Sequence, residues 1–290
     1  MEYEKIIAIK SLQRLKENGV IINKRIDFSD GEFMSELNIS KSDIENKDIL
    51  IIGSTDNEDS KNLMELLQVI RIVSSNFGRP HVIIPYFGWA RQDRTDGKMT
   101  CVTAKLIADM IKVSGAKTVK TFDVHLPQIE SFFDIPFENV DKKDIFIEKI
   151  KNDMKELDSP VICSPDAGSF KMGFEFSKLL EIPQVSLNKL RLEANKIAEM
   201  QIFGNVENKD VIIIDDMLDT GGTLCRTAKF LKESGANKVL AYATHGVLSG
   251  KAFENLNNSE IDKLTITNSI NKDLSDLKIK FEVIDIFKKI

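Results

Sequence analysis

The chain alternates between short apolar runs and amphipathic segments, which is the pattern of an α/β fold. Unbroken or nearly unbroken apolar stretches predict strands at residues 6–9, 20–22, 48–55, 82–86, 118–124, 160–164, 184–187, 211–214, 238–244, 264–267 and 281–286. Apolar residues at intervals of three and four predict helices at residues 62–73, 103–113, 145–154, 174–180 and 252–256. We expect parallel sheets with helices on both faces.

This alternation of strands and helices occurs twice along the 290 residues. A chain of this length is long enough to build two hydrophobic cores. We therefore predict two α/β domains, at residues 1–138 and 139–290. The final strand can complete the second sheet or return to the first, and the pattern does not decide between these arrangements.

The most informative segment, residues 211–223, reads V-I-I-I-D-D-M-L-D-T-G-G-T. Its apolar start predicts a strand that is buried on both faces, and we expect that strand to leave the sheet at Asp215 and Asp216. Leucine and alanine spaced three and four residues apart after Thr223 predict a helix, which we expect to end at Gly235.

A strand, a glycine-rich loop and a helix N-terminus together form an anion site, because unpaired N–H groups and the helix dipole attract negative charge. Gly221 and Gly222 let the backbone approach the anion closely, and Thr220 and Thr223 add hydroxyl donors. The acidic residues would repel a simple phosphate but would accept hydrogen bonds from sugar hydroxyls. The segment favours a sugar phosphate, with an acidic structural turn as the competing interpretation.

Other predicted strand ends carry further polar residues. Residues 91–94, Arg-Gln-Asp-Arg, offer two guanidinium groups that suit a polyphosphate, or form a solvated loop. Asp123 and His125 would point to the same side of an extended chain and could hold a divalent cation, although an isolated histidine is more often structural. Asp166, after the strand at 160–164, is a candidate metal or hydroxyl ligand, or a turn residue.

Lys189 and Arg191 lie in a charged segment, residues 188–201, that has no clean hydrophobic period. We interpret this segment as an exposed flap that leads into a strand near residues 198–203. Cations on a flap can close over a reacting phosphate and stabilise its charge. A solvated run of charges is the simpler interpretation.

Composition excludes several classes of protein. The net charge of −5 argues against sequence-independent nucleic-acid binding, which needs a basic face. Three scattered cysteines without metal-ligand spacing are typical of reduced thiols in a cytoplasmic protein. The N-terminus lacks the apolar core of a signal peptide, and no apolar run approaches a membrane span in length. We expect a cytoplasmic protein with small anionic ligands and no membrane or nucleic-acid partner.

In combination, the motifs resemble those of ribose-phosphate pyrophosphokinases (PRPP synthetases). The motifs of this chain follow the order seen in that family. They are F-S-D-G-E, N-L-M-E-L-L, P-Y-F-G-W-A-R-Q-D-R, D-V-H-L-P-Q-I, F-F-D-I-P, S-P-D-A-G, the segment at 211–223, and A-T-H-G-V-L-S-G. Type I phosphoribosyltransferases are similar at residues 211–223 but lack the Arg-Gln-Asp-Arg loop and the histidine corner. The resemblance implies two phosphoribosyltransferase-type domains, each with a parallel sheet flanked by helices, assembled as homodimers and often as hexamers.

The resemblance also implies an activity: transfer of the β,γ-diphosphoryl group of Mg-ATP to the C1 hydroxyl of ribose 5-phosphate, giving PRPP and AMP, with Mg²⁺ as cofactor. It places ATP on Phe28, Asp30 and Glu32 from a neighbouring subunit and on Arg91, Gln92 and Asp96, and it places Mg²⁺ or ATP phosphates on His125, Asp166 and Asp123. It makes Lys189, Arg191 and His125 catalytic, assigns the ribose hydroxyls to Asp215 and Asp216, and assigns the 5-phosphate to Asp219, Thr220, Gly221, Gly222 and Thr223.

Departures from the family pattern leave two alternatives open. Residues 171–174 read Lys-Met-Gly-Phe where the family often has arginines, and Leu190 separates two basic residues that are usually adjacent. The first alternative is a diphosphokinase that acts on another 5-phosphoribosyl acceptor, such as ADP-ribose. The second is a regulatory homologue without catalytic activity.

Overall fold

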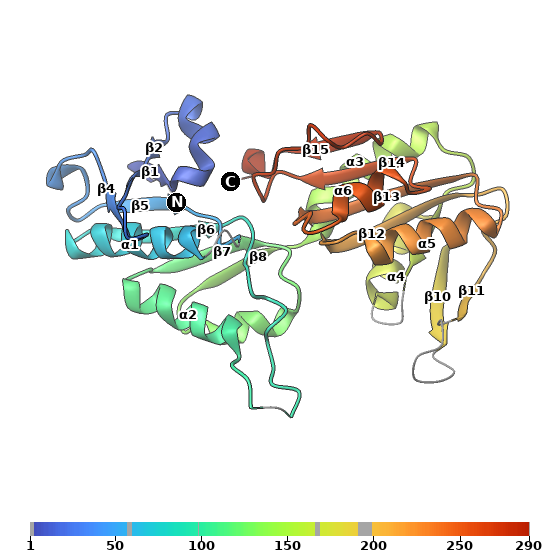
Figure 1. The fold of residues 1–290 in the computed structure, drawn as a ribbon, viewed down its shortest axis with the longest axis horizontal. Helices are drawn as coiled ribbons and strands as arrows, with labels where there is room; N and C mark the ends of the chain where they lie inside the picture. The colour runs from blue at the N-terminus through green and yellow to red at the C-terminus, as the bar shows by residue number, and fades with distance from the viewer. Residues whose placement is uncertain (1–2, 57–59, 98, 166–168, 191–198, 290) are drawn as a thin grey trace. The chain divides into compact units, whose positions relative to one another are not determined.

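The computed structural model describes residues 3–56, 60–97, 99–165, 169–190 and 199–289. The chain divides into two compact units, which we call unit 1 (Met1–Asp141 with Ser269–Asn271) and unit 2 (Lys142–Asn268 with Lys272–Ile290). Each unit contains one large sheet with helices, as Figure 1 shows. The described part of the chain has no helix that is both long enough and apolar enough to span a bilayer.

Unit 1 is built on a six-stranded sheet in which every pairing is parallel. Its strands, in spatial order, are β2 (Ile21–Ile22), β1 (Lys5–Ala8), β5 (Asp48–Ile52), β6 (Arg79–Ile84), β7 (Thr118–Phe122) and β8 (Phe137–Val140). Helices α1 (Lys61–Ser75) and α2 (Thr103–Ser114) and the 3₁₀ segments η1 (Lys10–Asn18), η2 (Lys41–Asp43) and η3 (Pro127–Phe132) join them. A separate antiparallel hairpin is formed by β3 (Lys24–Asp27) and β4 (Phe33–Glu36).

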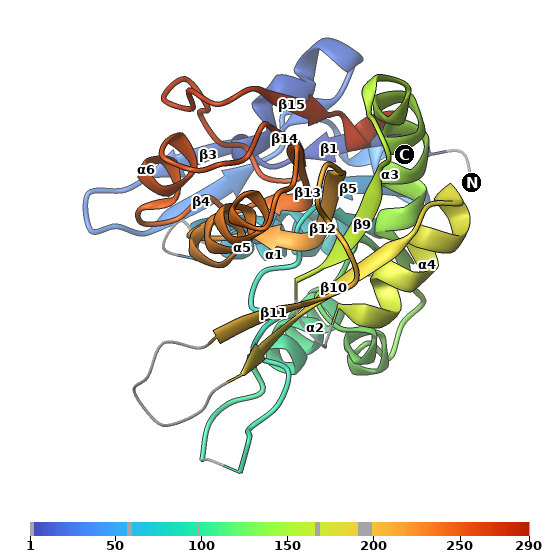
Figure 2. The same cartoon turned by 90° about the vertical axis from the view of Figure 1, so that its right-hand side faces the viewer.

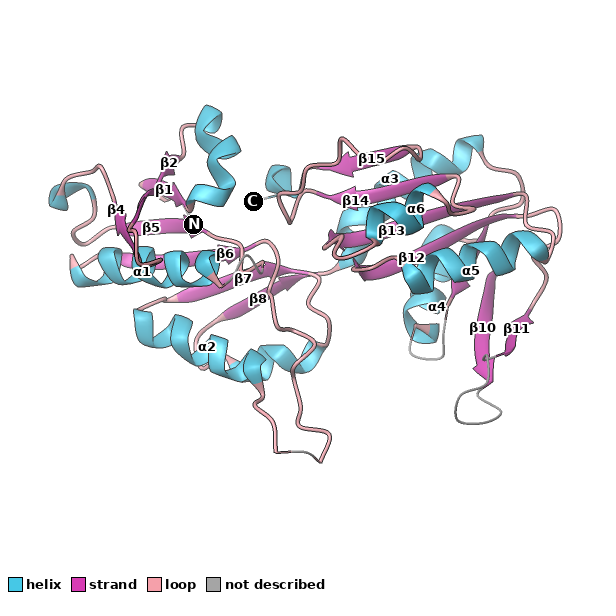
Figure 3. Ribbon diagram, viewed as in Figure 1, coloured by secondary structure: helices cyan, strands magenta, loops and turns pink. Residues whose placement is uncertain are grey.

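Unit 2 has a seven-stranded sheet that is parallel except at one edge. Its spatial order is β11 (Glu199–Phe203), β10 (Gln184–Leu190), β9 (Val161–Ser164), β12 (Asp210–Leu218), β13 (Lys238–Gly246), β14 (Lys263–Thr267) and β15 (Phe281–Ile284). Among the described strands of this sheet, only β10 and β11 pair in antiparallel fashion, and Figure 2 shows this two-stranded ribbon projecting beyond its sheet. The helices are α3 (Lys142–Asp153), α4 (Phe170–Leu180), α5 (Gly222–Glu233) and α6 (Ala252–Asn257), with short 3₁₀ segments at Met154–Glu156 and Ile286–Lys289 (Figure 3).

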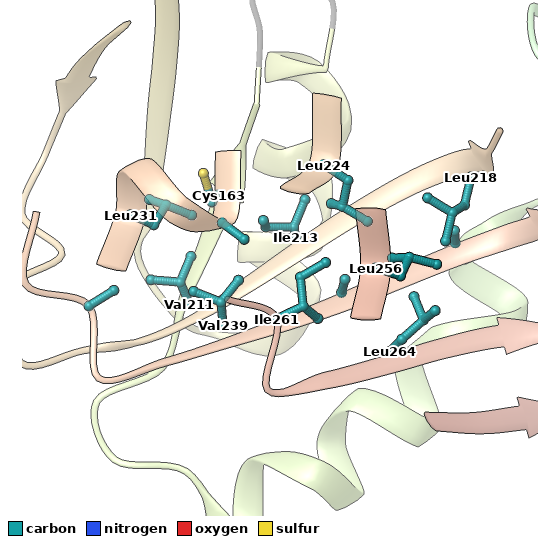
Figure 4. Close-up of a cluster of buried hydrophobic side chains, with 14 of the residues drawn as sticks. Cys163, Val211, Ile213, Leu218, Leu224, Leu231, Val239, Leu256, Ile261 and Leu264 are labelled. Carbon is teal, nitrogen blue, oxygen red and sulfur yellow. The ribbon is translucent and has the colours of Figure 1, made fainter. Parts of the chain in front are cut away.

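The predicted fold class is confirmed: both sheets are parallel over most of their width and both carry helices. In unit 2, Leu224 and Leu231 of α5 pack with Ile213 of β12, Val239 of β13 and Leu256 of α6 in one buried cluster (Figure 4). This packing explains why unbroken apolar runs predicted the strands, because strands that are covered on both faces have no polar side. The last strand, β15, completes the sheet of unit 2.

Two elements of the sheets were not foreseen. β8 has only two apolar residues, Phe137 and Val140, because it lies at an edge where half of its side chains reach solvent. The prediction that residues 188–201 form a loop before the next strand was wrong at its start, since β10 continues through Leu190 and pairs with β11. The antiparallel partner supplies backbone hydrogen bonds that no side-chain pattern reveals.

Candidate functional site

The glycine-rich segment joins β12 directly to α5. Gly221 occupies the N-cap of α5 with φ of 74°, a left-handed conformation that favours glycine over residues with a side chain. α5 begins at Gly222, slightly earlier than predicted, and the N–H of Cys225 donates to Gly221 O at 2.9 Å. The first N–H groups of α5 have no acceptor within the helix, so this end of the helix can bind an anion.

The expectation that the strand leaves the sheet at Asp215 and Asp216 was wrong. β12 runs on to Leu218, because the neighbouring strand β13 also continues, to Gly246, and keeps pairing with it. The Asp215 carboxyl is therefore largely buried. Burial and the adjacent Asp216 carboxylate raise the pKa of Asp215 to about 7, although the Asp216 N–H donates to Asp215 Oδ1 at 2.9 Å. Such a carboxylate is short of hydrogen-bond donors, which sugar hydroxyls can supply.

In unit 1, the loop after β6 is folded against the end of β5. The Gly88 N–H donates to Thr55 Oγ1 at 2.6 Å, and that hydroxyl donates to Tyr86 O at 3.0 Å. A Cβ atom at Gly88 would lie 2.3 Å from Thr55 O, so only glycine fits this close approach. The loop carries Arg91 and Gln92 as exposed residues beyond the carboxyl ends of β5 and β6, where ligands bind in open α/β sheets.

Hydrogen bonds connect this loop to the rest of unit 1. Gln92 Oε1 accepts from Thr103 Oγ1 at 2.6 Å, at the start of α2. The buried Asp93 accepts a hydrogen bond from Gln128 of η3, the segment that follows the histidine corner. Asp96, by contrast, is exposed and forms an ion pair with Arg94 at 2.7 Å, so its link to a ligand rests on the resemblance alone.

Asp123 and His125 follow β7, but not in the extended geometry that we expected. β7 ends at Phe122, and Asp123 has φ of 44°, so the alternation argument that placed both side chains on one side was wrong. The chain turns here because the N–H of Asp123 donates to Val140 O at 2.8 Å and the N–H of Val124 donates to Asn139 Oδ1 at 3.1 Å. Asp123 is buried, with 4% of its surface exposed, and His125 is half-buried.

Three of the predicted residues have no described side chain. Asp166 and Arg191 lie outside the described residues, and Lys189 is placed only by its backbone, in β10 opposite Met200. Within the described part of the chain, no three His, Cys, Asp or Glu side chains gather in a way that could hold a metal ion. Asp123 and His125 are the described members of the proposed Mg²⁺ set, and a carboxylate with an imidazole is a possible ligand pair for an ion that keeps waters and substrate phosphates as further ligands.

The turn that carries Phe28, Asp30 and Glu32 is the tip of the β3–β4 hairpin. The N–H of Phe28 donates to Glu32 O at 2.8 Å, and the N–H of Glu32 donates to Asp30 Oδ1 at 3.0 Å. These bonds close the turn, and Gly31 adopts φ of 91° within it. The tip is solvent-exposed, and Phe28 exposes 47% of its surface.

A buried carboxylate that the sequence did not reveal holds this hairpin. Glu65 of α1 is fully buried, and its Oε1 accepts from the backbone N–H of Lys10 at 2.7 Å and from Asn23 Nδ2 at 2.8 Å. Its Oε2 accepts from Arg25 Nη1 at 3.3 Å, in β3. A glutamate in the amphipathic segment at 62–73 would normally be assigned to the solvent side, and only its position among leucines could have signalled burial.

Replacing Glu65 with alanine is therefore expected to destabilise unit 1 by about 2–4 kcal/mol, because Arg25 and Asn23 lose their buried acceptor. Urea unfolding followed by the fluorescence of Trp89, the only tryptophan of the chain, measures this. The control is Glu36→Ala in the same hairpin, whose exposed pair with Lys24 at 2.7 Å is worth under about 1 kcal/mol. Equal losses of stability in the two variants would show that Glu65 does not act as a buried acceptor that holds the hairpin.

Sequence reasoning also missed two residues beside the glycine-rich loop. Ser249 follows β13 and donates through its hydroxyl to Asp219 Oδ1, while Asn255 of α6 donates to Thr220 O at 2.8 Å. Ser249 belongs to the A-T-H-G-V-L-S-G motif, which marked the resemblance without suggesting a role. The pairing of β12 with β13 brings both residues to the loop.

Comparison with known families agrees with this architecture. Residues 13–115 match the model of the N-terminal domain of ribose phosphate pyrophosphokinase, and residues 175–290 match the phosphoribosyl synthetase-associated domain. The chain is similar to a phosphoribosylpyrophosphate synthetase from Mycobacterium smegmatis of known structure, with a TM-score of 0.88 and 27% identity over 98% of this chain and 95% of that one.

Sequence relatives are closer still. A ribose-phosphate pyrophosphokinase from Shewanella oneidensis is 43% identical over 246 residues, covering 84% of this chain and 76% of the relative. One from Chlorobaculum tepidum is 42% identical over 248 residues, covering 85% and 75%. At this level of identity over most of the chain, the protein is a member of the ribose-phosphate pyrophosphokinase family of enzymes.

Proposed function

We propose that the chain transfers the β,γ-diphosphoryl group of Mg-ATP to the C1 hydroxyl of ribose 5-phosphate. The observation that carries this proposal is the segment from β12 to α5. It combines a glycine-capped helix start, which suits a phosphate, with a pair of half-buried carboxyl residues, which suits ribose hydroxyls. A plain phosphate site would gain nothing from the two acids.

In this reaction the C1 oxygen of the sugar attacks the β-phosphorus of ATP, and the bond from the β-phosphorus to the α,β-bridging oxygen breaks. AMP leaves with that oxygen, and the proton of the C1 hydroxyl is released to solvent. Such a transfer depends on positioning and on charge stabilisation, and needs no covalent nucleophile. Mg²⁺ bound with ATP would supply neutralisation of the charge on the phosphate oxygens.

The chain's own residues would divide the two substrates between them. Asp215 and Asp216 would orient the ribose, and the loop from Asp219 to Thr223 would hold the 5-phosphate. On the ATP side, the exposed loop after β6 offers Arg91 and Gln92, and the tip of the β3–β4 hairpin offers Phe28, Asp30 and Glu32. His125, Asp123 and Asp166 would contact the metal or the phosphates of ATP, and Lys189 and Arg191 would stabilise the transferring group.

Further parts of the proposal concern organisation. Residues 1–138 would form the ATP-side domain and residues 139–290 the ribose 5-phosphate domain. The hairpin tip would act on a neighbouring subunit, which requires at least a homodimer, and the family resemblance extends this to a hexamer. The substrates of such a reaction are cytoplasmic metabolites, so a cytoplasmic location is part of the same proposal.

The test is AMP release by the purified protein from Mg-ATP, with ribose 5-phosphate and ADP-ribose supplied separately. We expect release with ribose 5-phosphate. Release with ADP-ribose alone would instead support the second candidate, a diphosphokinase with a larger phosphoribosyl acceptor. That candidate rests on residues 171–174, which read Lys-Met-Gly-Phe where the family often has arginines and where Phe174 exposes 51% of its surface. Release with neither acceptor would indicate a regulatory role.

A further inference from the structure

The connection between β13 and α6 donates hydrogen bonds to backbone carbonyls of the glycine-rich loop. The N–H of Ser249 donates to Asp219 O at 3.1 Å. The side-chain amide of Asn255 donates to Thr220 O at 2.8 Å. Both donors are half-buried and come from one short stretch of chain. The loop is thus held from one side over consecutive peptide groups.

These bonds determine where the N–H groups of the loop point. The N–H of Leu248 also donates to Leu218 O, at 3.0 Å, so the carbonyls of three successive residues face the β13–α6 connection. In a trans peptide the C=O and the following N–H point in opposite directions. The N–H groups of Asp219, Thr220 and Gly221 therefore face away from that connection and are turned toward the other side of the loop.

Ser249 makes a second contact that concerns charge. Its hydroxyl donates to Asp219 Oδ1, which holds the carboxylate on the same side as the carbonyls. A carboxylate that is held there lies away from the N–H groups of the loop, where an anion would bind. If the hydroxyl were removed, the carboxylate could rotate toward the anion and repel it.

The connection is itself well anchored. Leu256 of α6 is fully buried and Leu248 exposes only 4% of its surface, and both belong to the cluster that includes Leu218 and Leu224 (Figure 4 shows Leu218, Leu224 and Leu256). Packing of these leucines fixes α6 against α5 and β12, so Ser249 and Asn255 donate from a rigid support.

We propose that Ser249 and Asn255 are positioning residues that orient the N–H groups of the loop, and the Asp219 carboxylate, for binding of the substrate's 5-phosphate. This inference rests on the proposed function, and it adds a requirement for the β13–α6 connection that the loop motif does not contain. Neither residue needs to contact the substrate.

The experiment measures AMP release against ribose 5-phosphate concentration at saturating Mg-ATP, and ribose 5-phosphate binding by calorimetry. We expect Ser249→Ala to raise the KM and Kd for ribose 5-phosphate about tenfold, and Asn255→Leu about fivefold. The KM for ATP should stay within about twofold in both. Ser249→Thr retains the hydroxyl and should restore most of the binding. The matched control is Ser234→Ala, which removes a half-buried hydroxyl that donates to Phe230 O at 2.8 Å at the end of α5.

The outcomes separate the inference from the proposed function. If the wild type turns over ribose 5-phosphate but the KM of the Ser249→Ala and Asn255→Leu variants is unchanged, the inference is overturned and the function stands. Equal rises in KM for ATP and for ribose 5-phosphate would also overturn it, since they would indicate general damage. If the wild type releases no AMP with ribose 5-phosphate, the proposed function fails. Calorimetry with ribose 5-phosphate and ADP-ribose then tests the positioning role. Weaker binding by the variants than by the wild type supports that role, while equal binding or no binding overturns it. If Ser249→Ala does not fold, Asn255→Leu carries the test.

Discussion

Alanine at Lys189 is expected to lower kcat about 10³-fold while leaving the fold intact. Lys189 lies in β10 beyond Ser186, the last residue of that strand that pairs with β9, on the ribbon formed with β11. A cation at the end of such a ribbon can reach a reacting phosphate, and removal of one preorganised charge costs about 10²- to 10³-fold or more in phosphoryl and acyl transfer. Steady-state AMP release with Mg-ATP and ribose 5-phosphate measures the effect.

The loss should fall on kcat more than on the KM for either substrate, because the charge on the transferring group is greatest in the transition state. The control is Lys229→Ala, which removes another lysine of unit 2, one that is 69% exposed and pairs only weakly with Glu233 along α5. Turnover by Lys189→Ala within about threefold of the control would show that the ribbon carries no catalytic cation.

The sequence predicted the central strands well because their burial on both faces leaves an unambiguous signal. Residues 49–52 and 211–214 are almost entirely buried in the structure. The glycine-rich loop could be predicted equally well, since Gly221 adopts a positive φ that residue types with a side chain rarely adopt. In both cases one physical requirement restricts the choice of residue at one position.

What the sequence could not predict depends on partners that are distant along the chain. Glu65 is buried because Asn23 and Arg25, some forty positions earlier, supply its donors. The length of β12 depends on the length of β13, and the turn at Asp123 depends on a carbonyl of β8. Hydrogen bonds of this kind are set by topology and leave no local pattern of hydrophobicity.

Replacing Asp215 with asparagine is expected to lower kcat/KM for ribose 5-phosphate about 100-fold and to stabilise the unliganded protein at pH 8. The first effect follows from the loss of charge-assisted hydrogen bonds to the ribose, each worth about 1.5–3 kcal/mol. The second follows from the buried carboxyl, whose pKa is raised to about 7 by burial and by Asp216. Kinetics in ribose 5-phosphate and thermal unfolding from pH 4 to pH 8 measure the two.

The sign of the stability effect is fixed by linkage. Folding raises the pKa of Asp215 from its ordinary value of 3.8. The contribution of this carboxyl to the free energy of unfolding is therefore greatest below pH 4 and declines as the pH rises to about 7. Asparagine cannot ionise. Between pH 4 and about 7, the free energy of unfolding of the variant should therefore rise by on the order of 2–4 kcal/mol relative to that of the wild type, and the difference should not grow above that pH. As a control, Asp273→Asn should show no such gain, because the backbone N–H of Ser275 lowers the pKa of Asp273.

The two effects of Asp215→Asn have one cause, and a third measurement tests that link. Hydroxyl donors of bound ribose stabilise the ionised carboxylate and so lower its pKa. Binding of ribose 5-phosphate to the wild type at pH 6.5 should therefore release a fraction of a proton, which calorimetry in buffers of different ionisation enthalpy detects. The Asp215→Asn variant, titrated at concentrations that match its weaker affinity, should release less. Equal proton release by both proteins would mean that the raised pKa and the ribose site are unrelated, and that Asp215 is an acidic residue of the strand alone.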